Sequence, residues 1–394
     1  MTHWLVRVLE AVAVLGVCSG MGYYGLCVWS AVRFLPARNK ATASGVATRA
    51  TRFMPPLSIL KPLRGTDPGI YESFCSHCRQ DYPEYEIIFG VSEPDDPAIE
   101  LVERLKLEFP ERPISLLVCP RILGTNVKVS NLAQMLPLAR YECLVVNDSD
   151  IRVEPDYLRR VIAPLANEKV GMVTCLYRGT AAATLGSRLE SLGISTDFSG
   201  AVLLAKEVEG GLRFALGSTM AFRRSELAAI GGFETLVDYL ADDYELGARI
   251  SAQGFQVKLA DVVVETFLPP YSLGRFVDHQ LRWARSVRDS RPWGYFGLGL
   301  TFGFPWALLA LLLARGAVWS WVFLAITLAL RLIMALVIGL RVLRDRQVIP
   351  LMWLVPLRDV VALLVWIGSY AGHTIHWRGG HFRLKDGKLV RIGT

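Results

Sequence analysis

A stretch of 22 residues without a charged side chain, Ala11 to Val32, constrains this chain more than any other feature. As a helix it would be about 33 Å long, enough to cross the hydrocarbon core of a bilayer. A cleaved signal peptide would be shorter and would carry its basic residues before the apolar run. Here five basic residues follow instead, at positions 33, 38, 40, 49 and 52. We therefore predict a transmembrane signal anchor within residues 1–35, with the following segment on the cytoplasmic side.

The rest of the composition also indicates a membrane protein. Of the 394 residues, 52% are hydrophobic, and the mean hydropathy of +0.34 is too apolar for an ordinary soluble domain. Further apolar stretches lie at 295–314, 317–340 and 349–375, which predicts transmembrane segments within residues 294–376. Pro356, Arg358 and Asp359 interrupt the last stretch, which is either one span or a broken re-entrant pair. The side of the basic tail, residues 377–394, therefore stays open.

Charge and cysteine content narrow the partners and the compartment. The net charge of +7 suits a protein at a surface of anionic lipids. No zinc-finger spacing, RNP-like motif or basic–aromatic repeat supports nucleic acid as a partner. The seven cysteines are an odd, scattered set, and the Cys75–Cys78 pair has no second pair with metal-ligand spacing. A reducing environment for the soluble part fits this pattern best.

Between the apolar ends, strand and helix patterns alternate. Strand-like runs at 57–61, 86–92, 114–118 and 143–146 are separated by helix-like segments at 70–79, 98–109 and 130–138. This alternation predicts an α/β fold with a mostly parallel central sheet, whose ligands bind at the carboxyl ends of the strands. We assign the sheet to a cytosolic domain at residues 57–270, joined to the anchor by a linker at residues 36–56.

The best-defined candidate site follows the fourth strand. In YECLVVNDSD, residues 141–150, an apolar run is followed by Asp148 and Asp150, one residue apart. Two adjacent carboxylates repel each other, and a divalent cation bound between them and a diphosphate would relieve the repulsion. A solvated turn or a helix N-terminus is the alternative explanation. A second acidic loop, Glu93 to Asp96, follows the second strand and is expected at the same sheet edge.

Three further features lie towards the C-terminus. Gly217-Ser218-Thr219 is a turn suited to close backbone approach. Asp242 and Asp243 begin a helix that ends near Gly254, where they either act chemically or only favour the helix N-terminus. Residues 271–293 form an amphipathic helix, rich in arginine and containing the sequence HQLRW, that can lie in a membrane interface.

The four motifs VSEPDDPA (91–98), NDSD (147–150), ADDYELG (241–247) and HQLRW (279–283) together resemble the membrane glycosyltransferases of family 21 and family 2 type. Among these, the set is most similar to ceramide glucosyltransferases and to the bacterial glycosyltransferases of hopanoid biosynthesis. The resemblance runs from about Ser58 to Arg291, plus the anchoring spans. It implies a GT-A fold, a UDP-sugar donor, a divalent cation (Mg²⁺ or Mn²⁺) and inversion at the anomeric carbon.

The resemblance also implies roles for individual residues at the donor site. Glu93 and Asp95 match the first acidic site, which binds the nucleoside, although the ceramide enzymes usually have Asp where this chain has Glu93. Lys128 resembles a lysine near the nucleotide. Asp148 and Asp150 match the metal site, through which Asp148 also contacts the donor. The ceramide branch often has Gly in place of the second acid.

The remaining roles concern catalysis and the acceptor. Asp243 matches the catalytic base, which takes the proton of the acceptor hydroxyl, and Asp242 lies beside it at the acceptor. Arg282 and Trp283 match the end of a (Gln/Arg)-x-x-Arg-Trp motif. In this motif the arginine neutralises the leaving diphosphate and the tryptophan walls the acceptor site. His279 stands where the motif usually has Gln or Arg, and we assign it to the acceptor.

The resemblance leaves the substrate open between two lipids. Two features favour the hopanoid branch: both acids of the D-x-D pair are present, and the chain contains HQLRW. This branch implies transfer of N-acetylglucosamine to bacteriohopanetetrol in a bacterial inner membrane. The ceramide branch implies glucose on ceramide instead. A processive polysaccharide synthase is a third reading, although only about 100 residues follow the amphipathic helix, too few for a translocation channel. A non-enzymatic scaffold is disfavoured because every acidic motif position is filled.

Overall fold

The computed structural model describes residues 2–43, 53–377 and 380–392, and it divides into two compact units. The first unit comprises residues 1–37, 181–207 and 270–386, and the second comprises 38–180, 208–269 and 387–394. Residues 181–207, from the middle of the predicted cytosolic domain, thus group with the apolar ends of the chain. Much of the predicted linker, residues 44–52, lies outside the described residues.

An eight-stranded sheet forms the centre of the second unit, in the order β3-β2-β1-β4-β7-β6-β8-β5. Its strands are β1 (Leu57–Pro62), β2 (Tyr85–Val91), β3 (Ile114–Val118), β4 (Cys143–Val146), β5 (Ile151–Arg152), β6 (Val170–Thr180), β7 (Met220–Arg223) and β8 (Gln256–Phe267). Strands β1 to β4 pair in parallel, β6 pairs in parallel with β8, and β7 is antiparallel to both β4 and β6. The predicted mostly parallel sheet is confirmed.

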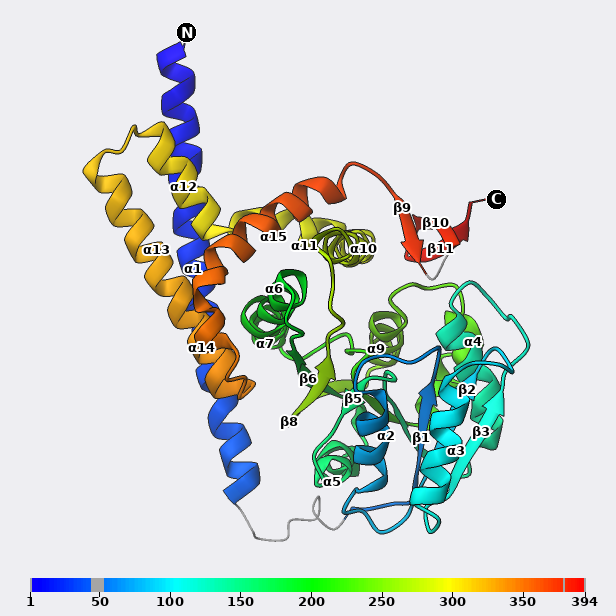
Figure 1. Cartoon of the computed structure of the whole chain (residues 1–394). Helices are drawn as coiled ribbons and strands as arrows, with labels where there is room; N and C mark the ends of the chain where they lie inside the picture. Colours follow the sequence, from blue (N-terminus) through cyan, green and yellow to red (C-terminus); the bar gives the residue numbers. More distant parts are fainter. Residues whose placement is uncertain (1, 44–52, 378–379, 393–394) are drawn as a thin grey trace. The chain divides into compact units, whose positions relative to one another are not determined.

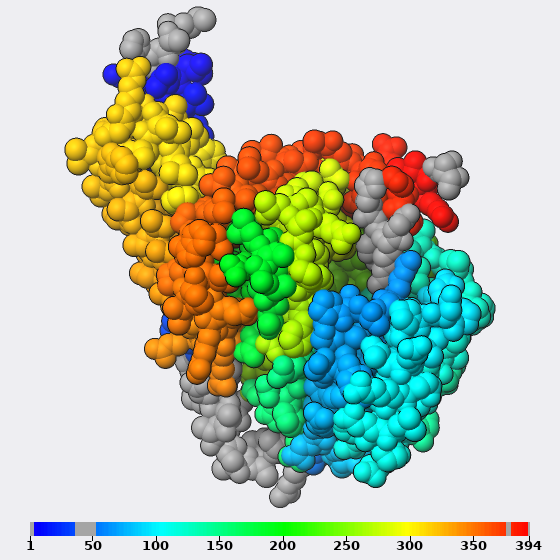
Figure 2. Space-filling model, viewed as in Figure 1, coloured from blue at the N-terminus to red at the C-terminus, as the bar shows by residue number. Residues whose placement is uncertain are grey.

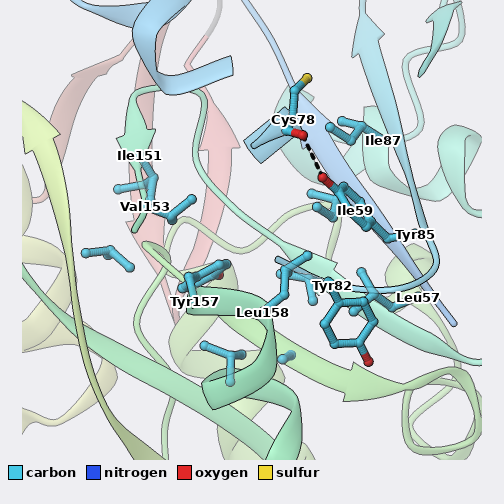
Figure 3. Close-up of a cluster of buried hydrophobic side chains, with 14 of the residues drawn as sticks. Leu57, Ile59, Cys78, Tyr82, Tyr85, Ile87, Ile151, Val153, Tyr157 and Leu158 are labelled. Carbon is cyan, nitrogen blue, oxygen red and sulfur yellow. Dashed lines mark hydrogen bonds between the residues drawn. The ribbon is translucent and has the colours of Figure 1, made fainter. Parts of the chain in front are cut away.

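Both faces of this sheet are covered, because successive residues of the buried strands are mostly apolar and point to opposite sides. On one face, Leu57, Ile59 and Ile87 belong to a single hydrophobic cluster with residues of helices α2 (Ile70–Cys78), α3 (Ala98–Glu108) and α5 (Tyr157–Ile162). Figure 3 shows part of this cluster, where the Tyr85 hydroxyl donates to the Cys78 carbonyl over 2.9 Å. On the other face, Gly90 lies directly beneath Met135 of helix α4.

The helices of the second unit connect the strands in chain order. They are α2 (Ile70–Cys78), α3 (Ala98–Glu108), α4 (Val127–Met135), α5 (Tyr157–Ile162), α8 (Arg224–Ala229) and α9 (Asp242–Ala252). Figure 2 shows the blue and cyan face of this unit, which the segments from β1 to β3 form. Helix α4 begins at Val127, three residues before its predicted start, because the Asn126 side chain accepts from the Val129 N–H and caps it.

The loops expected to bind ligands do lie at one edge of the sheet. In the parallel pairing, Leu60 of β1 is opposite Val146 of β4, and Pro62 is opposite Gly90 of β2. Strand β7 runs the other way and starts at Met220, opposite Val146. The turn before β7 therefore shares the edge with the loops that follow β1, β2 and β4.

The first unit is built of helices and one strand pair. They are α1 (Thr2–Ala43), α6 (Leu185–Gly193), α7 (Ser199–Val208), α10 (Leu273–Ser290), α11 (Pro292–Gly297), α12 (Gly303–Leu313), α13 (Val318–Leu336), α14 (Val348–Leu351), α15 (Val355–Ser369), β9 (Thr374–Trp377) and β10 (Gly380–Lys385). Segments 4–35, 318–342 and 348–369 are long and apolar enough to cross a membrane, and the bent pair 292–301 and 303–313 would make a fourth candidate span. Helices of this kind near both ends of the chain agree with the prediction.

Small residues bring α1 and α12 into close contact, and α13 lies alongside them (Figure 1). A Cβ atom on Gly20 would lie only 2.2 Å from the Cα atom of Gly303, so neither position has room for a side chain. Ala13 and Val17 of α1 pack against Ala307 of α12. In a bilayer the lipid is as apolar as the helix surfaces, so the hydrophobic effect does not drive helices together. Small residues that let two backbones approach closely support their association instead.

The charged residues that interrupt the C-terminal apolar stretches form a buried ion pair. Arg331 of α13 is 1% exposed and donates to both carboxylate oxygens of Asp359 over 2.8–3.1 Å. The guanidinium also donates to the carbonyl and hydroxyl oxygens of Thr196 over 3.2 Å. The sequence left the stretch at 349–375 as one span or a re-entrant pair. In the structure, Asp359 from this interruption bonds to Arg331, so it connects helix α15 with helix α13 in the first unit.

Candidate functional site

Buried polar groups fix the D-x-D loop, residues 147–150, which follows β4 and contains Asp148 and Asp150. Asn147, fully buried, donates to the Ser218 carbonyl over 2.8 Å and to the Tyr157 hydroxyl over 2.9 Å. The ammonium group of Lys61, at the end of β1, donates to the Asp148 carbonyl over 3.0 Å. These bonds fix the backbone of the loop, so that Asp148 and Asp150 leave it in defined directions.

The two carboxylates of the loop have different environments. The Asp148 side chain is 41% exposed, and one of its oxygens lies 2.8 Å from Lys128 Nζ. The Asp150 side chain accepts from the Thr266 hydroxyl of β8. Burial and the neighbouring Asp148 charge raise the pKa of Asp150 to about 6.

Lys128 links the D-x-D loop to the start of α9. Its ammonium group lies 2.8 Å from Asp148 Oδ1 and 3.1 Å from Asp242 Oδ2. The Asn126 side chain donates to the other Asp242 oxygen over 3.3 Å. Burial alone would lower the pKa of Lys128, but the charges of Asp148, Asp242 and Asp243 outweigh it and raise this pKa well above its usual value. Lys128 is therefore a fixed positive charge.

Asp243 faces the same point as Asp148. Its Oδ2 atom accepts from the Gly217 N–H over 2.7 Å, and its Oδ1 atom accepts from the Tyr244 N–H over 2.8 Å. A Cβ atom on Gly217 would lie 3.1 Å from Asp148 Oδ2 and 3.2 Å from Asp243 Oδ2. At this turn the backbone thus approaches the two carboxylates closely, and a side chain at position 217 would require these carboxylates to shift.

Electrostatics prepares Asp243 for proton transfer near neutral pH. Burial, followed by the charge of Asp242, raises its pKa to about 6, while Lys128 acts in the opposite direction. At pH 7 the group is then mostly ionised, yet basic enough to accept a proton.

Two buried bases lie under the D-x-D loop. Burial lowers the pKa of Lys61 to about 7, although the charges of Asp150 and Asp148 oppose this shift. Burial and the Lys61 charge lower the pKa of His77 to about 3, so its ring is neutral. The ring nitrogens of His77 lie 2.8 Å from the Ser73 carbonyl oxygen and 3.3 Å from Asn147 Oδ1.

The first acidic loop has a different character. Glu93 and Asp95 are exposed on the loop after β2, at the sheet edge that also carries the D-x-D loop. The buried member of this loop is Asp96, whose carboxylate accepts from the Gly65 N–H over 2.9 and 3.0 Å and from the Ala98 N–H over 2.9 Å. Asp96 thereby ties the loop after β1 to the start of α3. Contact between Glu93 or Asp95 and a nucleoside stays a prediction.

The HQLRW residues lie on α10 in the first unit. The His279 ring stacks on Tyr271 with centroids 5.5 Å apart and lies 5.1 Å from the ring of Trp283. His279 Nδ1 is 3.3 Å from a carboxylate oxygen of the buried Glu190. Arg282 is half-buried on the same helix. The structure thus brings together Lys128, Asp148, Asp242 and Asp243 in one unit and places His279, Arg282 and Trp283 in the other. Their meeting around one substrate stays a prediction.

The D-x-D loop has the chemistry of a hard-cation site. Within the described residues, no cluster of three or more His, Cys, Asp or Glu side chains is arranged as a metal site. Mg²⁺ and similar cations are often held by one or two carboxylates, with substrate phosphates and water as the other ligands. The half-exposed Asp148 with its neighbour Asp150 fits that mode, and a cation here would need the donor to complete its ligand shell.

Several residues of the site carry no local signal that would predict them. Lys61 contacts a residue 87 positions away, and Asn126 contacts Asp242 across 116 positions. Its sequence position could have indicated Asn126 only as the N-cap of α4, and the predicted helix starts too late for that. Asn147 directly follows β4, and it bonds this loop to the Gly217 turn through the Ser218 carbonyl.

Comparisons with known proteins cover most of the chain. The sequence model of glycosyl transferase family 21 matches residues 12–390. Ceramide glucosyltransferase 3 of Caenorhabditis elegans is 25% identical over 233 residues, which are 59% of this chain and 50% of that enzyme. Ceramide glucosyltransferase 1 of the same organism is 26% identical over 208 residues, which are 52% and 44% of the two chains. The chain thus spans about half the length of the curated relatives it matches.

The fold also has a relative among solved structures. The mannosyltransferase PcManGT from Pyrobaculum calidifontis, solved in complex with GDP-Man and Mn²⁺, superposes with a TM-score of 0.53. The two are 20% identical, and the match covers 90% of this chain and 99% of that one. This likeness concerns the fold, and the predicted GT-A architecture is confirmed.

Proposed function

The chain belongs to glycosyl transferase family 21, and from this membership and the acidic cluster at the sheet edge we propose that it transfers a sugar from a UDP-sugar to a hydroxyl group of a membrane lipid. The observation that carries the proposal is the convergence of Asp148 and Asp243 beside Gly217, where Lys128 pairs with Asp148 and with the neighbouring Asp242. A donor held at Asp148 would place its sugar within reach of Asp243.

In the proposed reaction, Asp243 accepts the proton of the acceptor hydroxyl while the hydroxyl oxygen attacks the anomeric carbon. The bond from that carbon to the diphosphate oxygen breaks on the opposite side, so configuration inverts. The bonds from Gly217 and Tyr244 to its carboxylate orient this base. Arg282 supplies positive charge to the leaving diphosphate, and Trp283 and His279 contact the acceptor.

A divalent cation would be held by Asp148 and Asp150 and would neutralise diphosphate charge when bound. We expect chelation by EDTA to abolish transfer and added Mn²⁺ or Mg²⁺ to restore it. Undiminished transfer in EDTA would exclude a required cation.

The similarity to ceramide glucosyltransferases favours ceramide as the acceptor and glucose as the sugar. The sequence motifs favour the hopanoid branch instead, so N-acetylglucosamine on bacteriohopanetetrol is the alternative. The decisive experiment incubates the purified full chain with UDP-glucose or UDP-N-acetylglucosamine and with either ceramide or bacteriohopanetetrol. Glucosylceramide is the expected product. Transfer to neither lipid would remove both assignments, and a polymeric product would instead indicate a polysaccharide synthase.

The matched control is Asp243→Asn, which keeps the shape of the side chain but cannot accept the proton. It should bind UDP like the wild type and lose transfer. We further propose that the catalytic unit faces the cytoplasm of a bacterial inner membrane, because the basic residues after the first span favour that side.

A further inference from the structure

The segment just before the two acids of α9 has no regular structure of its own. Residues 237–241 lie between a short 3₁₀ turn and Asp242. Their backbone polar groups therefore need partners from elsewhere in the chain, because unpaired buried groups are costly. The position of Asp242 and Asp243 relative to Lys128 depends on how this segment is held.

One side of the segment is bonded to the loop that precedes α4. The Asn126 N–H donates to the Val237 carbonyl over 2.6 Å, and the Asn126 side chain donates to the Tyr239 carbonyl over 2.8 Å. Thr125 donates through its N–H and its hydroxyl to the Asp238 carboxylate over 3.0 and 3.1 Å. Lys128 follows directly in α4, so this side connects the segment to the ammonium group of the site.

The other side is bonded to the C-terminal tail, in the strand β11 (Lys388–Arg391). The Leu389 N–H donates to the Asp238 carbonyl over 2.7 Å, and the Leu240 N–H donates to the Gly387 carbonyl over 3.2 Å. Tyr239 and Lys388 form an antiparallel bridge between these bonds. The tail turns into this position through Gly387, whose φ of +77° few other residues adopt.

Side chains reinforce the backbone contacts. Leu389 is 3% exposed, which is unusual for a residue so near the end of a basic tail. The Lys388 ammonium lies 5.3 Å from the centre of the Tyr239 ring, and the Arg249 guanidinium of α9 lies 5.0 Å from the same centre. Tyr239 therefore connects the tail to the helix that begins with the two acids.

We propose that residues 387–389 act as a clamp that positions Asp242 and Asp243 for the reaction. The clamp and the 124–126 loop hold opposite sides of the segment 237–241, so α9 can start only where Asp242 meets Lys128 and Asp243 meets Gly217. The residues of the clamp touch no reacting atom, and they act through the segment. This inference rests on the proposed function for its catalytic part, whereas the ordering of the segment can be measured without it.

The test compares three variants of the full chain in detergent. The first ends at Asp386 and lacks the clamp. The second is Leu389→Pro, which removes the N–H donated to Asp238. The control is Arg391→Met, which removes an exposed charge from the same strand but keeps both backbone bonds. For each we would measure kcat, the Kd of UDP, and hydrogen exchange of the peptide 238–245, with the β4 peptide as an internal reference.

We expect truncation and Leu389→Pro to lower kcat at least tenfold and to accelerate exchange in 238–245 at least tenfold. The Kd of UDP should stay within twofold, exchange in β4 should not change, and the control should resemble the wild type. Unchanged exchange in 238–245 would overturn the clamp whatever the activity. A rise in the Kd of UDP as large as the loss of kcat would mean that the tail supports the whole fold, which also overturns it. If the wild type transferred no sugar, the proposed function would fail while the exchange data still decided the clamp.

Discussion

The acidic limb of the pH profile offers the sharpest test of the site, because two neighbours of Asp243 act on its pKa with opposite signs. Asp243 must be ionised to accept a proton, and its pKa is raised to about 6. Activity should therefore rise with pH through about 6 and fall roughly tenfold for each unit below it. The Lys128 charge lowers this pKa and the Asp242 charge raises it. Lys128→Met should then move the limb to higher pH, and Asp242→Asn to lower pH.

The size of the shift follows from the geometry. Lys128 Nζ and Asp243 Oδ2 lie 3.6 and 3.2 Å from one point beside Gly217, so they are at most about 7 Å apart. At about 6 Å and an effective dielectric constant of about 20, one unit charge contributes roughly 3 kcal/mol, or about two pKa units. Water that enters in place of the ammonium group would reduce this, so we expect a shift of one to two pH units for Lys128→Met.

The assay is kcat/KM against pH from about 4.5 to 8.5, because this ratio reports groups of the free enzyme. Asp243→Asn should lower kcat by roughly a factor of 10² to 10⁴ and remove the limb. Superimposable limbs in the wild type, Lys128→Met and Asp242→Asn would refute the electrostatic reasoning. Retention of wild-type kcat by Asp243→Asn would refute its role as the base.

Three further predictions concern packing, topology and stability. Gly217→Ala should reduce kcat at least tenfold with an unchanged melting temperature, because its methyl group would lie 3.1–3.2 Å from two carboxylate oxygens; full activity would show that the turn can move away. Because β11 bonds to residues 238–240, the tail must lie on the same side of the membrane as the second unit. An impermeant maleimide should therefore label Val390→Cys and Lys169→Cys in vesicles of the same orientation. Labelling in opposite orientations would exclude the pairing. Arg331→Met should destabilise the protein by about 3–5 kcal/mol by leaving Asp359 buried without its partner. Adding Asp359→Leu should recover most of that loss in chemical denaturation, and equal stability of the single and double variants would contradict it.

The sequence was sufficient for the parts of the fold that have local signals. Apolar runs of strand length, separated by helical periodicity, predicted β1 to β4 and the shared sheet edge, because each element carries its own pattern. The same holds for Asp242 and Asp243, which begin α9 as predicted. The antiparallel strand β7 was not predicted, because its four residues after the Gly217 turn lack a distinctive pattern.

Contacts between distant segments were beyond local patterns. Arg331 and Asp359 are charged residues within apolar stretches, and their pairing across 28 positions compensates the two buried charges. The tail looked like a basic segment because Lys388 and Arg391 dominate its composition. Residues 238–240 hold it through one bridge and two backbone hydrogen bonds. Such interactions depend on the folded partner, so composition alone left the side of the tail open.

Charge balance connects the described site with the requirement for a cation. Asp148, Asp150, Asp242 and Asp243 gather at one sheet edge, where Lys128 and Lys61 are cationic groups that contact the acids or their loop. Lys61 loses part of its charge near neutral pH because burial lowers its pKa to about 7. A diphosphate adds further negative charge. Lys128, already paired with two carboxylates, and Lys61, bonded to the Asp148 carbonyl, cannot offset it. The donor should therefore bind weakly on its own and tightly together with a divalent cation. Calorimetric titration of UDP with and without Mn²⁺ measures this difference. Equal affinities would contradict it and would show that Lys128 breaks its ion pairs with the carboxylates and binds the diphosphate directly.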